Sequence, residues 1–156
     1  MKVNNISISQ NGTIEDIIDV FGGALPESHP ESFVARKILQ NQTFVAFNEE
    51  NPVGFLFFEI LWGNTPYLEL LKIKEEYRRQ GIGFKLLESC ISELKNLGFK
   101  FLNSSTETIN DLGKGFHQKY GFKEIGKLQM QHGEEIFFNL NFEDFNEINS
   151  NKEFVG

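Results

Sequence analysis

The sequence is poor in cysteine and tryptophan, and it contains no long apolar run. With one cysteine in 156 residues, no internal disulfide can form, and we expect a reducing compartment. No apolar stretch approaches the ~18 residues that a membrane span requires. The first residues, Met1 to Asn5, lack the apolar segment of a signal peptide. We therefore expect a cytoplasmic protein with no membrane partner.

Positive charge is also scarce, because 15 Lys and Arg residues stand against 22 Asp and Glu residues, for a formal net charge of -7. An acidic chain is a poor match for nucleic acid, so we expect none as a partner. The charge weakly favours a cationic or amine substrate, although plain solubility also explains it. Apolar residues make up 40% of the chain, enough for the core of one domain, which we place at residues 1–142. We expect the tail, residues 143–156, to be loosely ordered.

Periodic apolar patterns divide the chain into strands and helices. Helices are expected after Thr13, after Pro30, from Gly83 to Leu97 and from Ile109 to Lys119. Strands are expected near Ile6 to Ser9, and at Thr43–Phe47, Val53–Trp62, Tyr67–Ile73, Phe99–Asn103, Phe122–Leu128 and Ile136–Phe142. The fold class is therefore α/β (or α+β), with a central mixed sheet of about seven strands flanked by about four helices.

The helix from Gly83 to Leu97 has the clearest pattern, and Gly98 ends it as a C-cap residue does. Its apolar stripe consists of Leu86, Leu87, Cys90, Ile91, Leu94 and Leu97. Since Cys90 lies on this stripe, we interpret it as a core residue and not as a nucleophile.

The segment from Arg78 to Gly83, Arg-Arg-Gln-Gly-Ile-Gly, joins a predicted strand to this helix. Backbone N–H groups at a helix N-terminus bind phosphate, and glycines let a ligand approach the backbone closely. A dinucleotide fingerprint needs a third glycine where Leu86 stands, and a P-loop needs a Gly-Lys-Ser/Thr ending. Taken alone, the segment predicts either a phosphate site or a tight strand-to-helix turn.

Two motifs resemble a known family. Arg78-x-x-Gly81-x-Gly83 resembles the Q/R-x-x-G-x-G/A signature of the GNAT superfamily of acyl-CoA-dependent N-acetyltransferases, and Ile73 to Tyr77 is similar to its V-x-P-x-Y lead-in, with Glu75 in place of Pro. Downstream, the segment from Asn110 to Phe122 resembles the family's N-x-x-A-x-x-F-Y-x-x-x-G-F motif. The resemblance implies a GNAT-like fold up to about Phe142, with a twisted, mostly antiparallel sheet, and acetyl-CoA as the acyl donor.

The resemblance also implies which residues hold the cofactor. Backbone amides from Arg79 to Phe84 would cradle the pyrophosphate, and the strand around Leu71 and Ile73 would hydrogen-bond the pantetheine and polarise the thioester carbonyl. The implied cofactor-binding residues are Leu71, Ile73, Arg78, Arg79, Gln80, Gly81, Ile82, Gly83, Phe84, Asn110, Gly113 and His117. No metal is expected.

The second motif carries a glycine that a helix does not favour. A helix-interior glycine costs roughly 1 kcal/mol relative to alanine. Asn110, Gly113 and His117 would share one helical face. Gly113 therefore indicates that something packs very closely against this face, whereas Gly115 has no such explanation.

Acetyl transfer to an amine needs a base that deprotonates the ammonium, and an acid for the departing thiolate. In the family the acid is commonly the Tyr of the F-Y pair, and His117 stands at that position here. Imidazole titrates near neutrality, so His117 is either this acid or a structural residue, with Tyr120 as the substitute one turn later.

Glu69 is the leading candidate for the base, because it is a carboxylate in an otherwise apolar strand beside the expected thioester site. The alternative for Glu69 is a surface salt bridge. Glu59 and His29 are weaker candidates, and a water-mediated route with no dedicated base also stays open.

The first functional hypothesis is an N-acetyltransferase that moves the acetyl group of acetyl-CoA to a primary amine of a small molecule or peptide, by direct attack in a ternary complex. One alternative is a non-catalytic GNAT-fold module that binds acyl-CoA as a sensor or regulatory subunit. Another is an unrelated nucleotide-binding domain. No motif identifies the acceptor, and an exposed last strand would support a homodimer.

Overall fold

The structure, a computed structural model, describes residues 5–149. Its contacts group the chain into two compact units, which are described separately: unit 1 (Met1–Glu59 and Leu70–Ser92) and unit 2 (Ile60–Glu69 and Glu93–Gly156). The hydrogen-bonded strand order is β1-β2-β3-β4-β5-β7-β6, in which β4 and β5 are parallel. The prediction of a mixed, mostly antiparallel sheet of seven strands is confirmed. The described residues contain five α-helices instead of the expected four.

Unit 1 begins with β1 (Ile6–Ser9), α1 (Ile14–Val20), α2 (Glu31–Leu39) and β2 (Thr43–Asn48), and continues into β3 (Asn51–Leu61). A capping box starts α1 at the residue that the sequence indicated. The backbone N–H of Asp16 donates to Thr13 Oγ1 at 3.2 Å, and the N–H of Thr13 donates to Asp16 Oδ2 at 2.9 Å.

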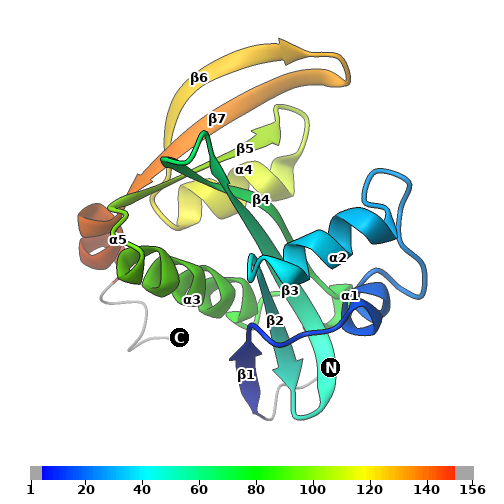
Figure 1. Cartoon of the computed structure of the whole chain (residues 1–156). Coiled ribbons are helices and arrows are strands. Elements are labelled where there is room, and N and C mark those ends of the chain that lie inside the picture. The colour runs from blue at the N-terminus through cyan, green and yellow to red at the C-terminus, as the bar shows by residue number, and fades with distance from the viewer. Residues whose placement is uncertain (1–4, 150–156) are drawn as a thin grey trace. The chain divides into compact units, whose positions relative to one another are not determined.

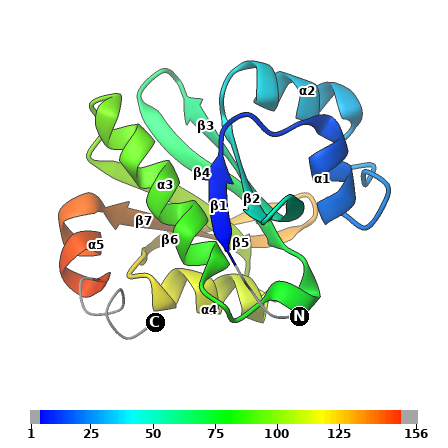
Figure 2. The same cartoon turned by 90° about the horizontal axis from the view of Figure 1, so that it is seen from below.

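The core of unit 1 lies where α1 and α2 pack against β2 and β3. Figure 2 shows α1 and α2 on one side of these strands, and the start of α3 (Ile82–Asn96) on the other. Six fully or almost fully buried side chains form the centre of this core: Ile17, Val20, Val34, Val45, Phe55 and Phe57. Each such side chain contributes roughly 1.5–3 kcal/mol of burial free energy. The last part of β4 (Thr65–Ile73) and the segment that follows it belong to the same unit as this core.

Unit 2 contains β5 (Phe101–Glu107), α4 (Asp111–Lys119), β6 (Lys123–Met130), β7 (Gly133–Asn141) and α5 (Phe142–Asn149), together with the first part of β4 and the ends of β3 and α3. Strand β7 is antiparallel to both β5 and β6, and β6 and β7 form a long hairpin that Figure 1 shows in yellow and orange. Helix α4 lies along β5. Because side chains alternate along a strand, Ser104 and Thr106 face α4 and Ser105 faces the opposite way.

The tail differs from its prediction. Residues 142–149 form α5, with Phe142 and Phe145 buried and with Asn149 Nδ2 donating to the Tyr120 carbonyl at 3.3 Å. The acidic composition suggested a loose tail, but apolar residues three residues apart give the segment one buried face. Residues 150–156 lie outside the described residues, and the assignment of one domain to residues 1–142 stays a prediction.

The predicted helix around Cys90 is confirmed, with Cys90 itself buried and Gly98 in a left-handed conformation (φ 94) just after the helix. Leu97 is the exception on the predicted stripe, since it is 57% exposed. Within residues 5–149, no helix has the length and hydropathy needed to cross a lipid bilayer.

Candidate active site

The segment from Arg78 to Gly83, which we call the glycine loop, starts from a fixed point in unit 1. A short 3-10 helix, η1 (Glu75–Tyr77), precedes it, and Tyr77 is buried with its hydroxyl accepting a hydrogen bond from Asn51 Nδ2 at 3.3 Å. The N–H of Lys74 donates to the Val53 carbonyl at 2.9 Å. Both contacts attach the start of the glycine loop to β3.

The conformation of the glycine loop explains Gly81. Its φ is 80°, in the left-handed region that glycine tolerates, and a Cβ built there would meet no atom within 4 Å. The N–H of Lys85 donates to the Gly81 carbonyl at 3.1 Å, so α3 begins directly after this residue. Gly81 is therefore required by backbone shape and not by packing, and it leaves open space at a helix N-terminus. These features fit a phosphate group.

Charges of both signs lie near the glycine loop: Arg78 and Arg79 within it, and Glu75 and Glu76 in η1 just before it. The first turn of α3 carries no acidic residue. Arg78 Nε donates to the Ile73 carbonyl at 3.2 Å, which holds this guanidinium at the end of β4, and Arg79 is exposed. No observation tests the predicted cofactor contacts of Leu71, Ile73 or residues 78–84, so these contacts stay predictions.

In unit 2, Asn110 caps α4 instead of lying inside it. Its side-chain carbonyl accepts from the Gly113 N–H at 3.0 Å, and its amide donates to Thr106 Oγ1 at 3.1 Å. The helix begins at Asp111, two residues later than expected. The side chain of Asn110 thus connects β5 to α4, and its predicted contact with the cofactor stays a prediction.

The close packing expected at Gly113 is confirmed. A Cβ at this position would overlap Thr106 Oγ1 and would lie 2.9 Å from Asn110 Nδ2, so the close neighbour is β5. At Gly115 a Cβ would meet no atom within 4 Å. From Ile109, Leu112, Phe116 and Tyr120 the sequence pattern predicts an apolar stripe beside this face, and the prediction is partly wrong, because Ile109 and Leu112 are exposed whereas Tyr120 is buried.

His117 is 4% exposed, and both of its ring nitrogens are hydrogen-bonded inside unit 2. Nδ1 lies 2.6 Å from the Gly113 carbonyl and Nε2 lies 2.8 Å from Ser104 Oγ, while the ring stacks on Phe138 with centroids 4.2 Å apart. A carbonyl only accepts, so Nδ1 carries a proton.

Burial lowers the pKa of His117, and the hydrogen bond to the Gly113 carbonyl opposes this shift in part. A neutral ring with its proton on Nδ1 leaves Nε2 as an acceptor, and the single proton of the Ser104 hydroxyl has two acceptors within reach, Nε2 at 2.8 Å and the Leu68 carbonyl at 3.3 Å. This arrangement joins α4 to β5. It favours the structural interpretation of His117, although its role as an acid stays a prediction.

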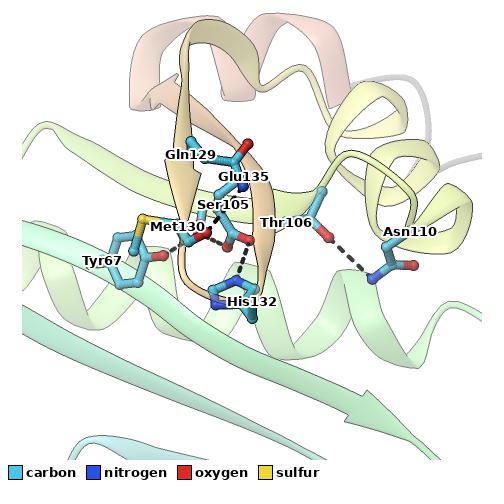
Figure 3. Close-up of polar contacts among 8 residues, drawn as sticks. All are labelled: Tyr67, Ser105, Thr106, Asn110, Gln129, Met130, His132 and Glu135. Carbon is cyan, nitrogen blue, oxygen red and sulfur yellow. Dashed lines mark hydrogen bonds and ion pairs between the residues drawn. The ribbon is translucent and has the colours of Figure 1, made fainter.

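A polar chain that the sequence did not reveal lies on the other face of β5 (Figure 3). Tyr67 of β4 is hydrogen-bonded to Ser105 of β5, and Ser105 Oγ donates to Glu135 Oε2 of β7 at 2.7 Å. Glu135 Oε1 lies 3.3 Å from His132 Nε2 in the β6–β7 turn. The predicted ends of the strands, Asn103 and Ile136, excluded Ser105 and Glu135, which is why the cluster was missed.

Tyr67 and Glu69 share one face of β4 because they are two residues apart. Burial raises the pKa of Tyr67, the hydrogen bond with Ser105 lowers it, and the charges of Glu135 and Glu69 raise it further. Glu69 is half-buried, with one carboxylate oxygen fully covered. The predicted base thus lies beside a tyrosine to which it is electrostatically coupled.

The other candidates are placed differently. Glu59 Oε2 forms an ion pair with the buried Lys37 at 3.0 Å, and Gln42 Nε2 donates to its other oxygen at 3.2 Å, which favours a structural role. His29 is half-buried, with Nδ1 2.8 Å from Ser28 Oγ. Tyr120 is buried at the end of α4, edge-on to the Phe116 ring.

Comparison with known proteins defines the class. The family model described as the acetyltransferase (GNAT) family matches residues 14–122, and the chain belongs to this family. It is therefore an acetyltransferase, and the membership supports acetyl-CoA as the acyl donor, as the sequence predicted.

Among curated relatives, the chain is 30% identical over 130 residues to an N-alpha-acetyltransferase of Saccharolobus solfataricus and 26% identical over 130 residues to one of Sulfurisphaera tokodaii. In both cases the match covers 74% of this chain and 78% of the relative.

Solved structures share the fold at lower identity. The PaiA N-acetyltransferase of Thermoplasma acidophilum, solved with coenzyme A, matches with a TM-score of 0.70 and 21% identity, over 88% of this chain and 99% of that one. Naa50 of Arabidopsis thaliana, solved with the bisubstrate analogue CoA-Ac-MVNAL, matches with a TM-score of 0.70 and 17% identity, over the same shares of the two chains.

Proposed function

We propose that this chain acetylates the α-amino group of a peptide or protein, with acetyl-CoA as donor, by direct attack in a ternary complex. The observation that carries the proposal is the match to two N-alpha-acetyltransferases over about three quarters of each chain, at 26% and 30% identity. The acidic composition also suits a cationic acceptor, since the α-amine is an ammonium ion at neutral pH. The same relatives favour an enzyme over a non-catalytic sensor.

In this proposal the glycine loop holds the CoA pyrophosphate. The open space at Gly81, the left-handed backbone and the absence of acidic residues in the first turn of α3 support this role. The backbone of Leu71 and Ile73 holds the pantetheine, and Asn110, Gly113 and His117 of the second motif contribute to the same ligand as the family resemblance implies. Bound acetyl-CoA supplies an activated acetyl group.

The catalytic residues are assigned from position. Glu69, half-buried on β4 two residues before Leu71, deprotonates the ammonium or holds it beside the thioester. His117 keeps α4 against β5 through Ser104 and acts on the leaving thiolate only if its ring is uncovered on ligand binding. Tyr120 would take that role in its place.

The acceptor class is tested by thiol release from acetyl-CoA with the peptide MVNAL, its Nα-acetylated form and a panel of small primary amines. We expect release with MVNAL and none with the blocked peptide, because the reacting nitrogen is the α-amine. Release with small amines only would refute the peptide acceptor. Measurable CoA binding with no amine-dependent release would favour the sensor.

The cofactor site is tested by Gly81→Glu. The substitution places a carboxylate and a strained backbone where the pyrophosphate binds, so we expect CoA affinity to fall by at least about 100-fold, or roughly 3 kcal/mol. Gly63→Glu is the matched control, because Gly63 is also exposed, has φ 76° and has nothing within 4 Å of a Cβ. Calorimetric titration with CoA gives both values, and retained affinity in Gly81→Glu would refute the assignment of the loop.

A further inference from the structure

Unit 2 contains a hydrogen-bonded chain that begins on β4 and ends in solvent. Figure 3 shows Tyr67, Ser105, Glu135 and His132 joined by successive dashed contacts; they come from β4, β5, β7 and the turn before β7. Ser105 is opposite Phe137 in the β5–β7 ladder, so Glu135, two residues away, is its diagonal neighbour on the same face.

The direction of each hydrogen bond follows from the groups involved. A carboxylate only accepts, so Ser105 donates its single proton to Glu135 Oε2 at 2.7 Å. Ser105 Oγ must then accept from the Tyr67 hydroxyl. The proton of Tyr67 therefore points towards Ser105, and the Tyr67 oxygen keeps lone pairs that can accept a proton from another group.

Solvent exposure of the hydrogen-bonded side chains increases from Glu135 to His132. The Glu135 side chain is 15% exposed, and that of His132 is 54% exposed. His132 Nε2 lies 3.3 Å from Glu135 Oε1, so the largely buried carboxylate of Glu135 contacts a side chain that is exposed to solvent.

We propose that a proton path runs from Tyr67 through Ser105 and Glu135 to solvent, and that it removes the proton that the acceptor ammonium must lose. His132 is the exit group at its outer end. This inference rests on the proposed acetylation of an amine. It makes Tyr67 the group that takes the proton from the ammonium, and it leaves Glu69 the role of holding the ammonium beside the thioester.

Each proton that the ammonium loses has a defined destination. The ammonium gives one proton to the oxygen of Tyr67, while Tyr67 passes its own proton to Ser105 and Ser105 passes its proton to Glu135. Glu135 releases that proton to His132 or to water. The neutral amine then forms the N–C bond as the C–S bond of the thioester breaks, and the second proton of the nitrogen leaves with the thiolate as CoA thiol.

The charges around Tyr67 favour a relay over a simple phenolate base. Burial and the carboxylates of Glu135 and Glu69 raise the pKa of Tyr67, so it stays protonated at neutral pH and accepts a proton only while it gives one away. Glu107 is opposite Glu135 in the ladder and adds negative charge on the same face, and His132 is the titratable neighbour at the outer end.

The test compares Ser105→Ala with Ser105→Thr, using acetyl-CoA and the best acceptor found among MVNAL and the amine panel. The alanine variant breaks the path, and we expect kcat to fall about 100-fold, with the KM of the acceptor little changed and a larger solvent deuterium isotope effect on kcat. The threonine variant keeps a hydroxyl, so it should recover most of the activity.

Glu135→Gln removes the proton acceptor and keeps the shape, so it should lower kcat as Ser105→Ala does. His132→Ala should have a small effect, because water reaches Glu135 without it. The matched control is Asn139→Ala, which breaks a 2.8 Å hydrogen bond to Asn103 on the same face of β5 and β7 but lies outside the path. Unchanged kcat and isotope effects in Ser105→Ala and Glu135→Gln would overturn the path and favour Glu69 or water as the direct base.

A second measurement needs no acceptor. Ultraviolet titration of the phenol, with Tyr67→Phe to identify its signal, should show Tyr67 ionising at lower pH in Glu135→Gln than in the wild type. An unchanged titration would show that Tyr67 and Glu135 are not coupled, and would overturn the path even if no amine were acetylated. If only the proposed function is wrong, the titration of Tyr67 will shift as expected but no acetyl group will be transferred to any peptide.

Discussion

Lys37 in unit 1 and His117 in unit 2 are both buried, but they differ in the groups around them. Lys37 is 0% exposed, and its ammonium donates to Gln42 Oε1 at 3.1 Å, to the Phe58 carbonyl at 2.8 Å and to Glu59 Oε2 at 3.0 Å. One of these three acceptors carries a full negative charge.

The hydrogen-bond partners that the structure gives His117 are neutral: a backbone carbonyl and a serine hydroxyl, with the Phe138 ring stacked on one side. A cation that is buried with an anion is compensated, whereas a base that is buried among neutral groups is favoured in its uncharged form. The comparison separates a buried ion pair from a buried base with neutral partners, and the two should respond differently to substitution.

Lys37→Met should have the largest effect on stability. It removes the ammonium and leaves the acceptors around it without this donor, so we expect a loss of about 3 kcal/mol in the free energy of unfolding. Urea denaturation measures the loss.

Lys74→Met is the matched control for Lys37→Met, because Lys74 forms a 3.2 Å ion pair with Asp19 whose carboxylate side chain is 53% exposed. Such a pair contributes less than about 1 kcal/mol. The double variant Lys37→Met with Glu59→Leu should recover part of the loss, because it removes the stranded carboxylate as well. Equal losses of unfolding free energy in Lys37→Met and Lys74→Met would show that the buried pair stabilises the fold no more than the exposed pair does.

Gly113→Ala should have the next largest effect, because it moves the carbonyl that accepts from His117. A Cβ would overlap Thr106 Oγ1, and we expect a net loss of about 1–2 kcal/mol even though alanine is the better helix former. Gly115→Ala on the same helix has open space and should gain about 0.5–1 kcal/mol. Thermal unfolding of the pair is the measurement, and a gain at both positions would contradict the close approach to β5.

The smallest effect concerns pH. The pKa of His117 is lowered in the fold, so below the ordinary histidine value of about 6.5 the unfolded chain binds a proton that the folded chain does not. Stability should therefore fall as pH falls from about 6.5 through the lowered folded-state pKa, and it should rise with pH over the same window. Urea midpoints at several pH values should show a weaker pH dependence in His117→Gln than in the wild type, and parallel curves would refute the neutral ring.

The sequence predicted those parts of the fold that local patterns determine. Three features depend only on residues close in the sequence, and they appear where expected: the capping box at Thr13, the strands, and the apolar stripe around Cys90. Helix α5 was missed, because its few apolar residues are helical only when Phe142 and Phe145 find a buried surface. Tertiary packing, which no local pattern contains, decides that segment.

In the candidate site, too, the sequence predicted the features that lie within one segment and missed the contacts between distant segments. The glycine loop and the close approach at Gly113 follow from glycine chemistry within one segment, so the sequence indicated both. The contacts of Lys37 with Glu59 and of Tyr67 with Ser105 join residues that are 22 and 38 positions apart. Such pairs depend on strand register, and a register cannot be read from one sequence when the strand ends are uncertain by a few residues.

The glycine loop has one more consequence, which concerns the entropy of binding. Arg79 (φ 64°) and Gly81 (φ 80°) both have left-handed backbones, and Tyr77 attaches the start of the loop to β3. A non-glycine residue in this conformation costs about 1 kcal/mol or more, and the cost is borne during folding, before any ligand arrives. If the glycine loop binds the pyrophosphate as proposed, this part of the ordering cost falls on folding and not on binding, which raises affinity without any additional contact.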